Sequence, residues 1–231
     1  MSLNPPILIS LFRSLGLLLL LAGVGQVAAQ TAHNPDEAAA DLLAQRIEKH
    51  GSLEQAQAEA RKSGQLVAER CYLCHGEDGN KTSSTSGLVI PNLAGQQPLY
   101  LLQQLRHFLA KSRNHPAMYS MIKDLGDEDL LNLVLYYSGQ TLQPMVSSYR
   151  DDEKEKGRQV YTKLCIYCHG PEAAGQLGIP RLRGQNPAYV VQNLLRFRDL
   201  SPDRLHEGMN TITAKLTDQE INALAVFLSS P

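Results

Sequence analysis

Two short stretches of the chain combine two cysteines and a histidine in the same order. They read Cys-Tyr-Leu-Cys-His at 71–75 and Cys-Ile-Tyr-Cys-His at 165–169, and they use all four cysteines of the chain. Positions i, i+3 and i+4 of a helix share one face, so both thiols and the imidazole of each stretch point the same way. Each stretch can therefore hold one planar group from one side.

This order and spacing are typical of covalent haem attachment. Two thiols one turn apart can each form a thioether with one vinyl group of a planar macrocycle, and the adjoining imidazole then reaches the iron from the same side. We predict two haem c groups, and these are their covalent and proximal residues: Cys71, Cys74 and His75 for one, Cys165, Cys168 and His169 for the other.

Three other uses of such cysteines fit the sequence less well. A zinc site would need the two pairs about fifteen to twenty residues apart, whereas one pair here starts at Cys71 and the other at Cys165. A thioredoxin-like redox pair expects a βαβ context, which the sequence does not show. Disulfides remain open for an exported protein, but they do not explain a histidine after each pair.

Both motifs belong to a longer internal repeat, which keeps the same order at an offset of 89 to 94 residues. The matched segments are Ile90–Gln96 with Ile179–Gln185, His115–Met118 with His206–Met209, and Leu125–Asp129 with Leu216–Glu220. We predict two domains over residues 64–143 and 152–231, joined by a linker at 144–151.

Helical signals recur in both copies. Pro98 and Pro187 suit a first helical turn, and Asn186 is a candidate N-cap. Thr217 and Glu220 form a capping box before a last helix, and Gly126 takes the cap position in the first copy. No stretch shows sustained strand alternation, so the predicted fold class is all-α.

The beginning of the chain reads as an export signal. A Leu-rich run follows Arg13 and leads to small residues, which predicts a signal peptide over 1–29 with cleavage after Ala29. An uncleaved anchor is the alternative, but the 16 residues of 14–29 are short for a membrane span. Residues 30–63 are predicted to be a helical extension that packs or is solvated, with no counterpart in the second copy.

The opposite face of each haem needs a second axial ligand, for which a methionine thioether is suited. The candidates are Met118 and Met121 in the first copy and Met209 in the second. Met118 stands seven residues before Leu125, as Met209 stands seven before Leu216, so the repeat selects Met118 and Met209. The predicted iron ligands are His75, Met118, His169 and Met209.

His115 and His206 also repeat, each three residues before its methionine. They are either rival ligands or hydrogen-bond donors to haem propionates or solvent, and we favour the second because a methionine is in register in both copies. With both axial positions filled, no iron is open to a substrate, and electron carriage is the expected role.

Composition excludes one class of partner. The net charge is −1 with no long basic run, so nucleic acid is not expected. Hydrophobic residues make up 43% and charged residues 19% of the chain, which indicates a folded globular protein rather than a disordered one.

Residues 64–231 resemble tandem class I cytochrome c domains of the di-haem cytochrome c-four group. The resemblance rests on the Cys-x-x-Cys-His motifs, the Ile-Pro segments before Gly-Gln, the methionines and the acidic-capped last helices. It implies two helical domains that each wrap one haem, with propionate edges near their interface. It also implies that the carbonyls of Pro91 and Pro180 accept hydrogen bonds from His75 and His169.

Proteins of this group pass electrons between redox partners in the periplasm, such as a membrane respiratory complex, a terminal oxidase or a periplasmic dehydrogenase. A membrane-associated location is an alternative to a diffusible one. Two other functions remain: an electron-accepting subunit of a larger oxidoreductase, and a di-haem peroxidase-type enzyme. The long segment before residue 64 and the Ser/Thr-rich loop at 80–86 depart from the group's pattern and leave the partner open.

Overall fold

The computed structural model describes residues 34–82, 87–143 and 149–229. Within these ranges the chain forms helices joined by irregular segments, and the β-structure is limited to an isolated bridge between Gln176 and Ile179. The predicted all-α class is confirmed. The predicted export signal and most of the predicted linker lie outside the described residues. None of the described helices is both long and apolar enough to cross a membrane.

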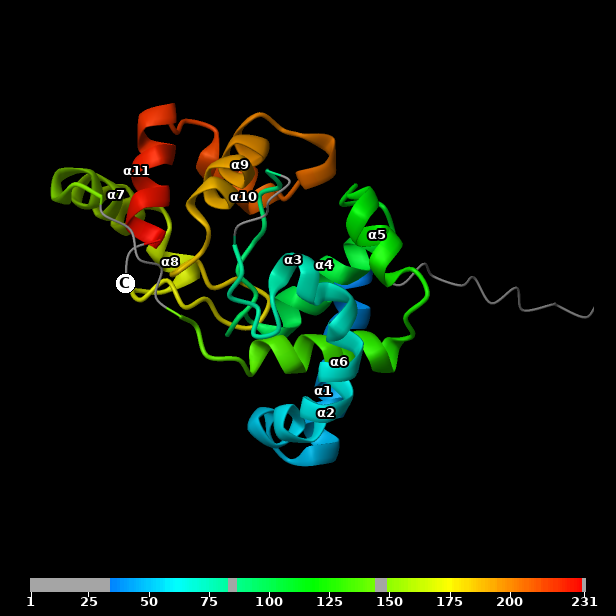
Figure 1. Cartoon of the computed structure of the whole chain (residues 1–231). Helices are drawn as coiled ribbons and strands as arrows, with labels where there is room; N and C mark the ends of the chain where they lie inside the picture. The colour runs from blue at the N-terminus through cyan, green and yellow to red at the C-terminus, as the bar shows by residue number, and fades with distance from the viewer. Residues whose placement is uncertain (1–33, 83–86, 144–148, 230–231) are drawn as a thin grey trace, which may run out of the picture. The chain divides into compact units, whose positions relative to one another are not determined.

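Within the described ranges, the α-helices of the two copies follow one another in a matching order (Figure 1). In the first copy these are α2 (Leu53–Ala68), α3 (Tyr72–His75), α4 (Pro98–Leu109), α5 (Pro116–Ile122) and α6 (Asp127–Ser138). In the second they are α7 (Asp151–Leu164), α8 (Ile166–His169), α9 (Pro187–Arg198), α10 (Glu207–Thr213) and α11 (Asp218–Ser229).

The first and last helices of each copy cross closely, α2 against α6 and α7 against α11. A glycine lies at each crossing. A Cβ atom on Gly64 would lie 2.3 Å from the carbonyl oxygen of Asn132, and one on Gly157 would lie 2.0 Å from that of Ala223. Because such distances are shorter than any van der Waals contact, only glycine lets the two backbones approach this far.

The prediction that residues 30–63 have no counterpart is wrong for their second half. α2 begins at Leu53, runs through the predicted boundary at residue 64, and packs as α7 does in the other copy. The sequences of these two helices share little beyond the crossing glycine, because α7 is dominated by charged residues. The structural repeat therefore includes a first helix in each copy that sequence similarity alone does not reveal.

Helix α1 (Pro35–His50) precedes the repeat and packs against α2, α4 and α6. Ala39 and Leu43 join the first core, and Arg46 is buried with Nη1 donating to Asn132 Oδ1 at 3.0 Å. His107 Nε2 of α4 lies 3.0 Å from an Asp36 carboxylate oxygen in the first turn of α1. The extension is thus a packed part of the first domain.

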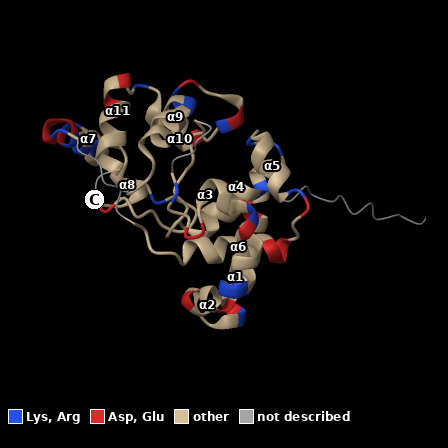
Figure 2. Cartoon of the chain, in the orientation of Figure 1, with Lys and Arg blue, Asp and Glu red and all other residues tan. Residues whose placement is uncertain are grey.

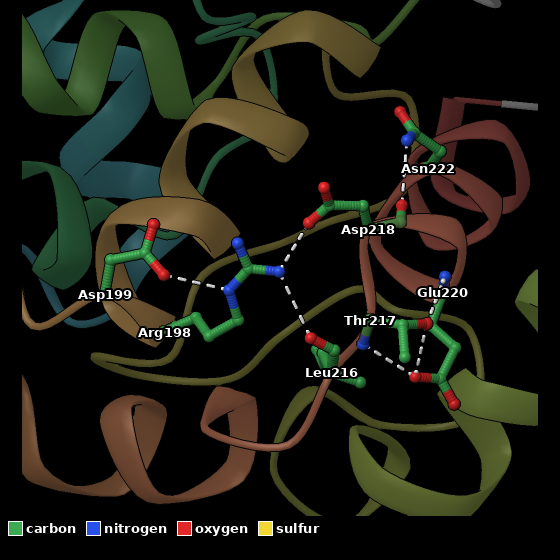
Figure 3. A network of polar contacts seen from close by, with 7 residues as sticks. All are labelled: Arg198, Asp199, Leu216, Thr217, Asp218, Glu220 and Asn222. Carbon is green, nitrogen blue, oxygen red and sulfur yellow. Dashed lines mark hydrogen bonds and ion pairs between the residues drawn. The ribbon is translucent and has the colours of Figure 1, made fainter.

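The last helix of the second copy begins at a side-chain cap, whereas that of the first begins at Gly126 without one. Thr217 Oγ1 accepts from the N–H of Glu220, and the Glu220 carboxylate accepts from the Thr217 N–H, as the capping box predicts (Figure 3). Arg198 of α9 donates to Asp218 Oδ1 at 2.6 Å and to the Leu216 carbonyl at 3.2 Å. This network ties α9 to the segment between α10 and α11.

Each copy has its own apolar core, in which the last helix contributes the most buried residues. Leu130, Leu131, Val134 and Leu135 of α6 are buried, as are Ile221, Leu224, Ala225 and Leu228 of α11. Lys, Arg, Asp and Glu residues gather on helices such as α7, whereas α3 and α8 contain none (Figure 2). The cysteine motifs therefore lie on uncharged helices set against these cores.

Candidate haem-binding sites

The four cysteines lie at the starts and within the first turns of the short helices α3 and α8. Cys71 and Cys165 are the residues just before these helices, and Cys74 and Cys168 lie inside them. All four are free thiols, so the structure contains no disulfide among them. Burial raises the pKa of the Cys71 and Cys165 thiols to about 11, which keeps both neutral. In the described ranges, no group of three or more His, Cys, Asp or Glu side chains is placed to hold a metal ion.

The histidine that ends each motif is buried and oriented by a backbone carbonyl. His75 Nδ1 lies 3.3 Å from the carbonyl oxygen of Pro91, and His169 Nδ1 lies 3.0 Å from that of Pro180. A carbonyl only accepts, so Nδ1 carries the proton and Nε2 keeps its lone pair. Burial lowers the pKa of His75 to about 4 and lowers that of His169 as well. Both imidazoles are therefore neutral and present one free nitrogen, as a metal ligand must.

A backbone hydrogen bond fixes each Ile-Pro segment two residues after its proline. The Gly79 carbonyl accepts from Leu93 N at 2.8 Å, and the Ala173 carbonyl accepts from Leu182 N at 2.7 Å. Gly175 has φ +68°, and a Cβ there would lie 2.4 Å from the Pro180 carbonyl carbon. A glycine is required there because the turn runs directly beneath the proline segment.

A tyrosine hydroxyl holds the backbone just after each histidine. Tyr137 of α6 donates to the Gly76 carbonyl at 3.2 Å, and Tyr161 of α7 donates to the Gly170 carbonyl at 2.5 Å. The two tyrosines come from different helices, the last of one copy and the first of the other. The same carbonyl is thus satisfied in both copies by residues that do not correspond in the repeat.

The predicted distal methionines lie near the start of short helices, α5 for Met118 and α10 for Met209. Both are half-buried, and Met118 packs against the first core. Met121, the alternative, is 46% exposed. Met118 is therefore the less exposed of the two candidates in the first copy.

His115 and His206 are the N-caps of these two helices, a role that the sequence did not indicate. His115 Nδ1 accepts from Met118 N at 3.2 Å, and His206 Nδ1 accepts from Met209 N at 3.3 Å. Burial, followed by the charge of Arg113, lowers the pKa of His115 and keeps it neutral. A neutral imidazole that accepts through Nδ1 carries its proton on Nε2, so it has no free lone pair for iron. Each histidine instead fixes the backbone of the methionine beside it.

Hydrogen bonds also run between the two copies in a reciprocal pattern. Arg113 of the first copy donates to the Tyr189 hydroxyl at 2.8 Å, and Arg204 of the second donates to the Tyr100 hydroxyl at 3.1 Å. Both guanidinium groups also donate to Gln104 Oε1. The two arginines lie in the segments that precede α5 and α10, and their partners lie on α4 and α9. The segments that lead to both predicted methionine ligands therefore meet at one polar interface.

Comparisons with known proteins agree with this geometry. The family model described as "Cytochrome C oxidase, cbb3-type, subunit III" matches residues 58–136 and 152–228. A cytochrome c4 from Azotobacter vinelandii is 32% identical over 189 residues, covering 72% of this chain and 86% of the relative. The reduced recombinant cytochrome c4 of Pseudomonas stutzeri matches with a TM-score of 0.64 at 29% identity, over 74% of this chain and 97% of that structure.

The chain belongs to the cytochrome c4 family. It is accordingly a di-haem electron-transfer cytochrome with two c-type domains, and it is an electron carrier rather than an enzyme. A further relative, from Thiomonas intermedia, is named "Thiosulfate dehydrogenase electron acceptor" and is 32% identical over 71% of this chain and 79% of its own length.

The residues of this cytochrome fit two haem groups. Each copy offers two free thiols and a neutral imidazole with an unused Nε2, which is the donor set that covalent haem requires. Arg181 adds an independent observation. The residue is only 6% exposed, and its Nε is buried without a hydrogen-bond partner. Desolvation lowers its pKa to about 10, so this buried cation suits an anionic group such as a haem propionate.

Proposed function

We propose that both haem irons of this cytochrome are held by one histidine and one methionine, His75 with Met118 and His169 with Met209. The observation that carries this proposal is the tautomer pattern common to both copies. The proximal histidines carry their proton on Nδ1, so the Nε2 lone pair is free. His115 and His206 accept a hydrogen bond through Nδ1 and carry their proton on Nε2, so neither has a free nitrogen lone pair. Methionine is therefore the soft donor available on the distal side.

The chain's own residues then perform three tasks during electron transfer. The cysteines attach the group covalently, and Pro91 and Pro180 keep the proximal imidazoles oriented. The histidine caps hold the methionine backbones. The haem supplies the one-electron couple when it is bound. Since the ligand sets are anchored on packed helices, little reorganisation is needed when the charge at iron changes.

We further propose that the protein is exported by residues 1–29, works in the periplasm, and exchanges electrons with redox proteins such as a respiratory complex, a terminal oxidase or a dehydrogenase. The support for export is the charge and hydropathy pattern of that segment. Mass spectrometry of the mature protein tests it: an N-terminus at Gln30 is expected, and a retained Met1 would contradict cleavage.

Carbon monoxide separates the carrier with filled axial positions from a di-haem peroxidase-type protein. The fully reduced protein is expected to bind carbon monoxide at neither haem at neutral pH. Ready binding at one haem would mean that a coordination position is open or easily opened, and the His/Met proposal would fail for that haem.

A second candidate is an electron-accepting subunit of a larger oxidoreductase. The observation in its favour is the relative named as the electron acceptor of thiosulfate dehydrogenase. Pull-down of the tagged holoprotein from its native cells tests this. Stoichiometric recovery of a catalytic subunit would support it, and recovery of the cytochrome alone would favour the diffusible carrier.

A further inference from the structure

Two equivalent glutamines, Gln96 and Gln185, each hydrogen-bond to the backbone of the opposite copy. Gln185 of the second copy is 4% exposed, and its carboxamide bonds both backbone groups of Asn92: Oε1 accepts from Asn92 N at 2.7 Å, and Nε2 donates to Asn92 O at 3.0 Å. Gln96 of the first copy is 3% exposed and does the same to Arg181, with distances of 2.7 Å and 3.0 Å. Each glutamine therefore holds a backbone segment of the opposite copy.

The backbone segments that the glutamines contact are the same ones that orient the proximal histidines. The N–H of Asn92 and the carbonyl of Pro91 belong to one peptide group, and that carbonyl accepts from His75 Nδ1. In the other copy, the N–H of Arg181 and the carbonyl of Pro180 form the peptide group that accepts from His169 Nδ1. A continuous chain of hydrogen bonds thus runs from each glutamine to the histidine of the other copy.

We propose that Gln96 and Gln185 are positioning residues that tune the proximal histidine of the opposite domain through this shared peptide group. The proposal rests on His75 and His169 being iron ligands, as proposed above. An acceptor on the N–H polarises the amide and makes its carbonyl a stronger acceptor. A stronger bond to Nδ1–H increases the electron density of the imidazole, and a more basic ligand favours ferric over ferrous iron. Each domain therefore lowers the reduction potential of the other.

A substitution of either glutamine should change the proximal histidine of the opposite domain more than that of its own domain. A purely structural role would not produce this difference. Gln185→Met removes the acceptor from the Asn92 N–H with little change in volume. In the reduced holoprotein, the Nδ1–H proton resonance of His75 is expected to move upfield, while that of His169 moves less. The equilibrium constant for reduction of the first haem is expected to rise about twofold, which is about 18 mV for one electron. Gln96→Met should show the mirror pattern at His169.

A matched control removes a cross-domain bond that does not lead to the ring Nδ1 of a proximal histidine, because the peptide group that it reaches donates, through Gly175 N, to the backbone carbonyl of His169. Gln97 lies next to Gln96, and its Nε2 donates to the Ala174 carbonyl at 3.0 Å. Gln97→Met is expected to leave both Nδ1–H resonances in place. A conservative variant provides a second arm: Gln185→Glu keeps an oxygen acceptor at the same position, so the His75 resonance should stay at or downfield of its wild-type position.

The outcomes test the axial-ligand proposal and the glutamine proposal separately. The wild-type protein must first show two haems with methionine-ligated ferric spectra, and failure there overturns the ligand assignment itself. With that established, equal shifts at both histidines, shifts no larger than those of Gln97→Met, or an effect confined to the glutamine's own domain would overturn the tuning proposal. If Gln185→Met does not load haem, an upfield His75 resonance in Gln185→Glu overturns it instead.

Discussion

The crossing of α7 and α11 leads to a quantitative prediction for Gly157→Ala. The new Cβ would lie 2.0 Å from the Ala223 carbonyl oxygen and 2.7 Å from Phe227 Cβ, and the closest atoms are backbone that no rotamer change can move. The helices would have to separate by about 1 Å to restore a tolerable contact. Overpacking of this kind costs about 3 kcal/mol at its upper end, and the gain in helix propensity offsets about 1 kcal/mol. The second domain should lose about 2 kcal/mol.

Thermal unfolding of the holoprotein followed by circular dichroism measures this loss. A destabilisation of about 2 kcal/mol corresponds to a fall in Tm of roughly 8–16 °C for a domain of this size. Gly208→Ala is the matched control. Its Cβ would meet only His206 ring atoms at 3.6 Å and 3.7 Å, so this helical glycine should tolerate alanine with unchanged or slightly raised stability. A Gly157→Ala protein as stable as the wild type would refute the close-crossing argument.

Three further predictions concern the sites and their supports. Met118→Ala should abolish the near-infrared band of methionine-ligated ferric haem for one haem, while Met121→Ala should leave it intact; the reverse result would show that the repeat register is wrong. Arg46→Ala removes a buried side chain from between α1 and α6 and should cost about 2 kcal/mol in chemical unfolding, whereas the exposed Arg61→Ala should change stability by less than about 0.5 kcal/mol. Tyr161→Phe removes one of the two donors to the Gly170 carbonyl, leaving the N–H of Ala173, and should destabilise the second domain by about 1 kcal/mol; an unchanged Tm would contradict a stabilising role for that bond.

Much of the fold could be predicted because local signals and the repeat agree. The prolines at 98 and 187, the Asn186 cap and the Thr217–Glu220 box all begin helices where the sequence places them. The hydrogen bonds from His75 and His169 to the proline carbonyls, which the family resemblance implied, are present. These features depend on residues a few positions apart or on motifs duplicated in order.

Other features depend on contacts between distant residues, which no local pattern records. Residues 53–63 belong to the first repeat because of a backbone crossing at Gly64, not because of shared side chains with α7. Tyr137 and Tyr161 reach equivalent carbonyls from helices that do not correspond. His115 and His206 were detectable as a repeated pair, but their capping role requires the helix starts to be known.

A spectroscopic redox titration of the purified holoprotein tests directly whether each iron is held by one histidine and one methionine. Two haems per chain, two one-electron steps, and a near-infrared methionine–iron(III) band are expected; the intensity of that band should correspond to both haems and disappear on reduction. A single haem, or a band that accounts for only one of the two, would contradict the assignment of His75 with Met118 and His169 with Met209 as paired axial ligands.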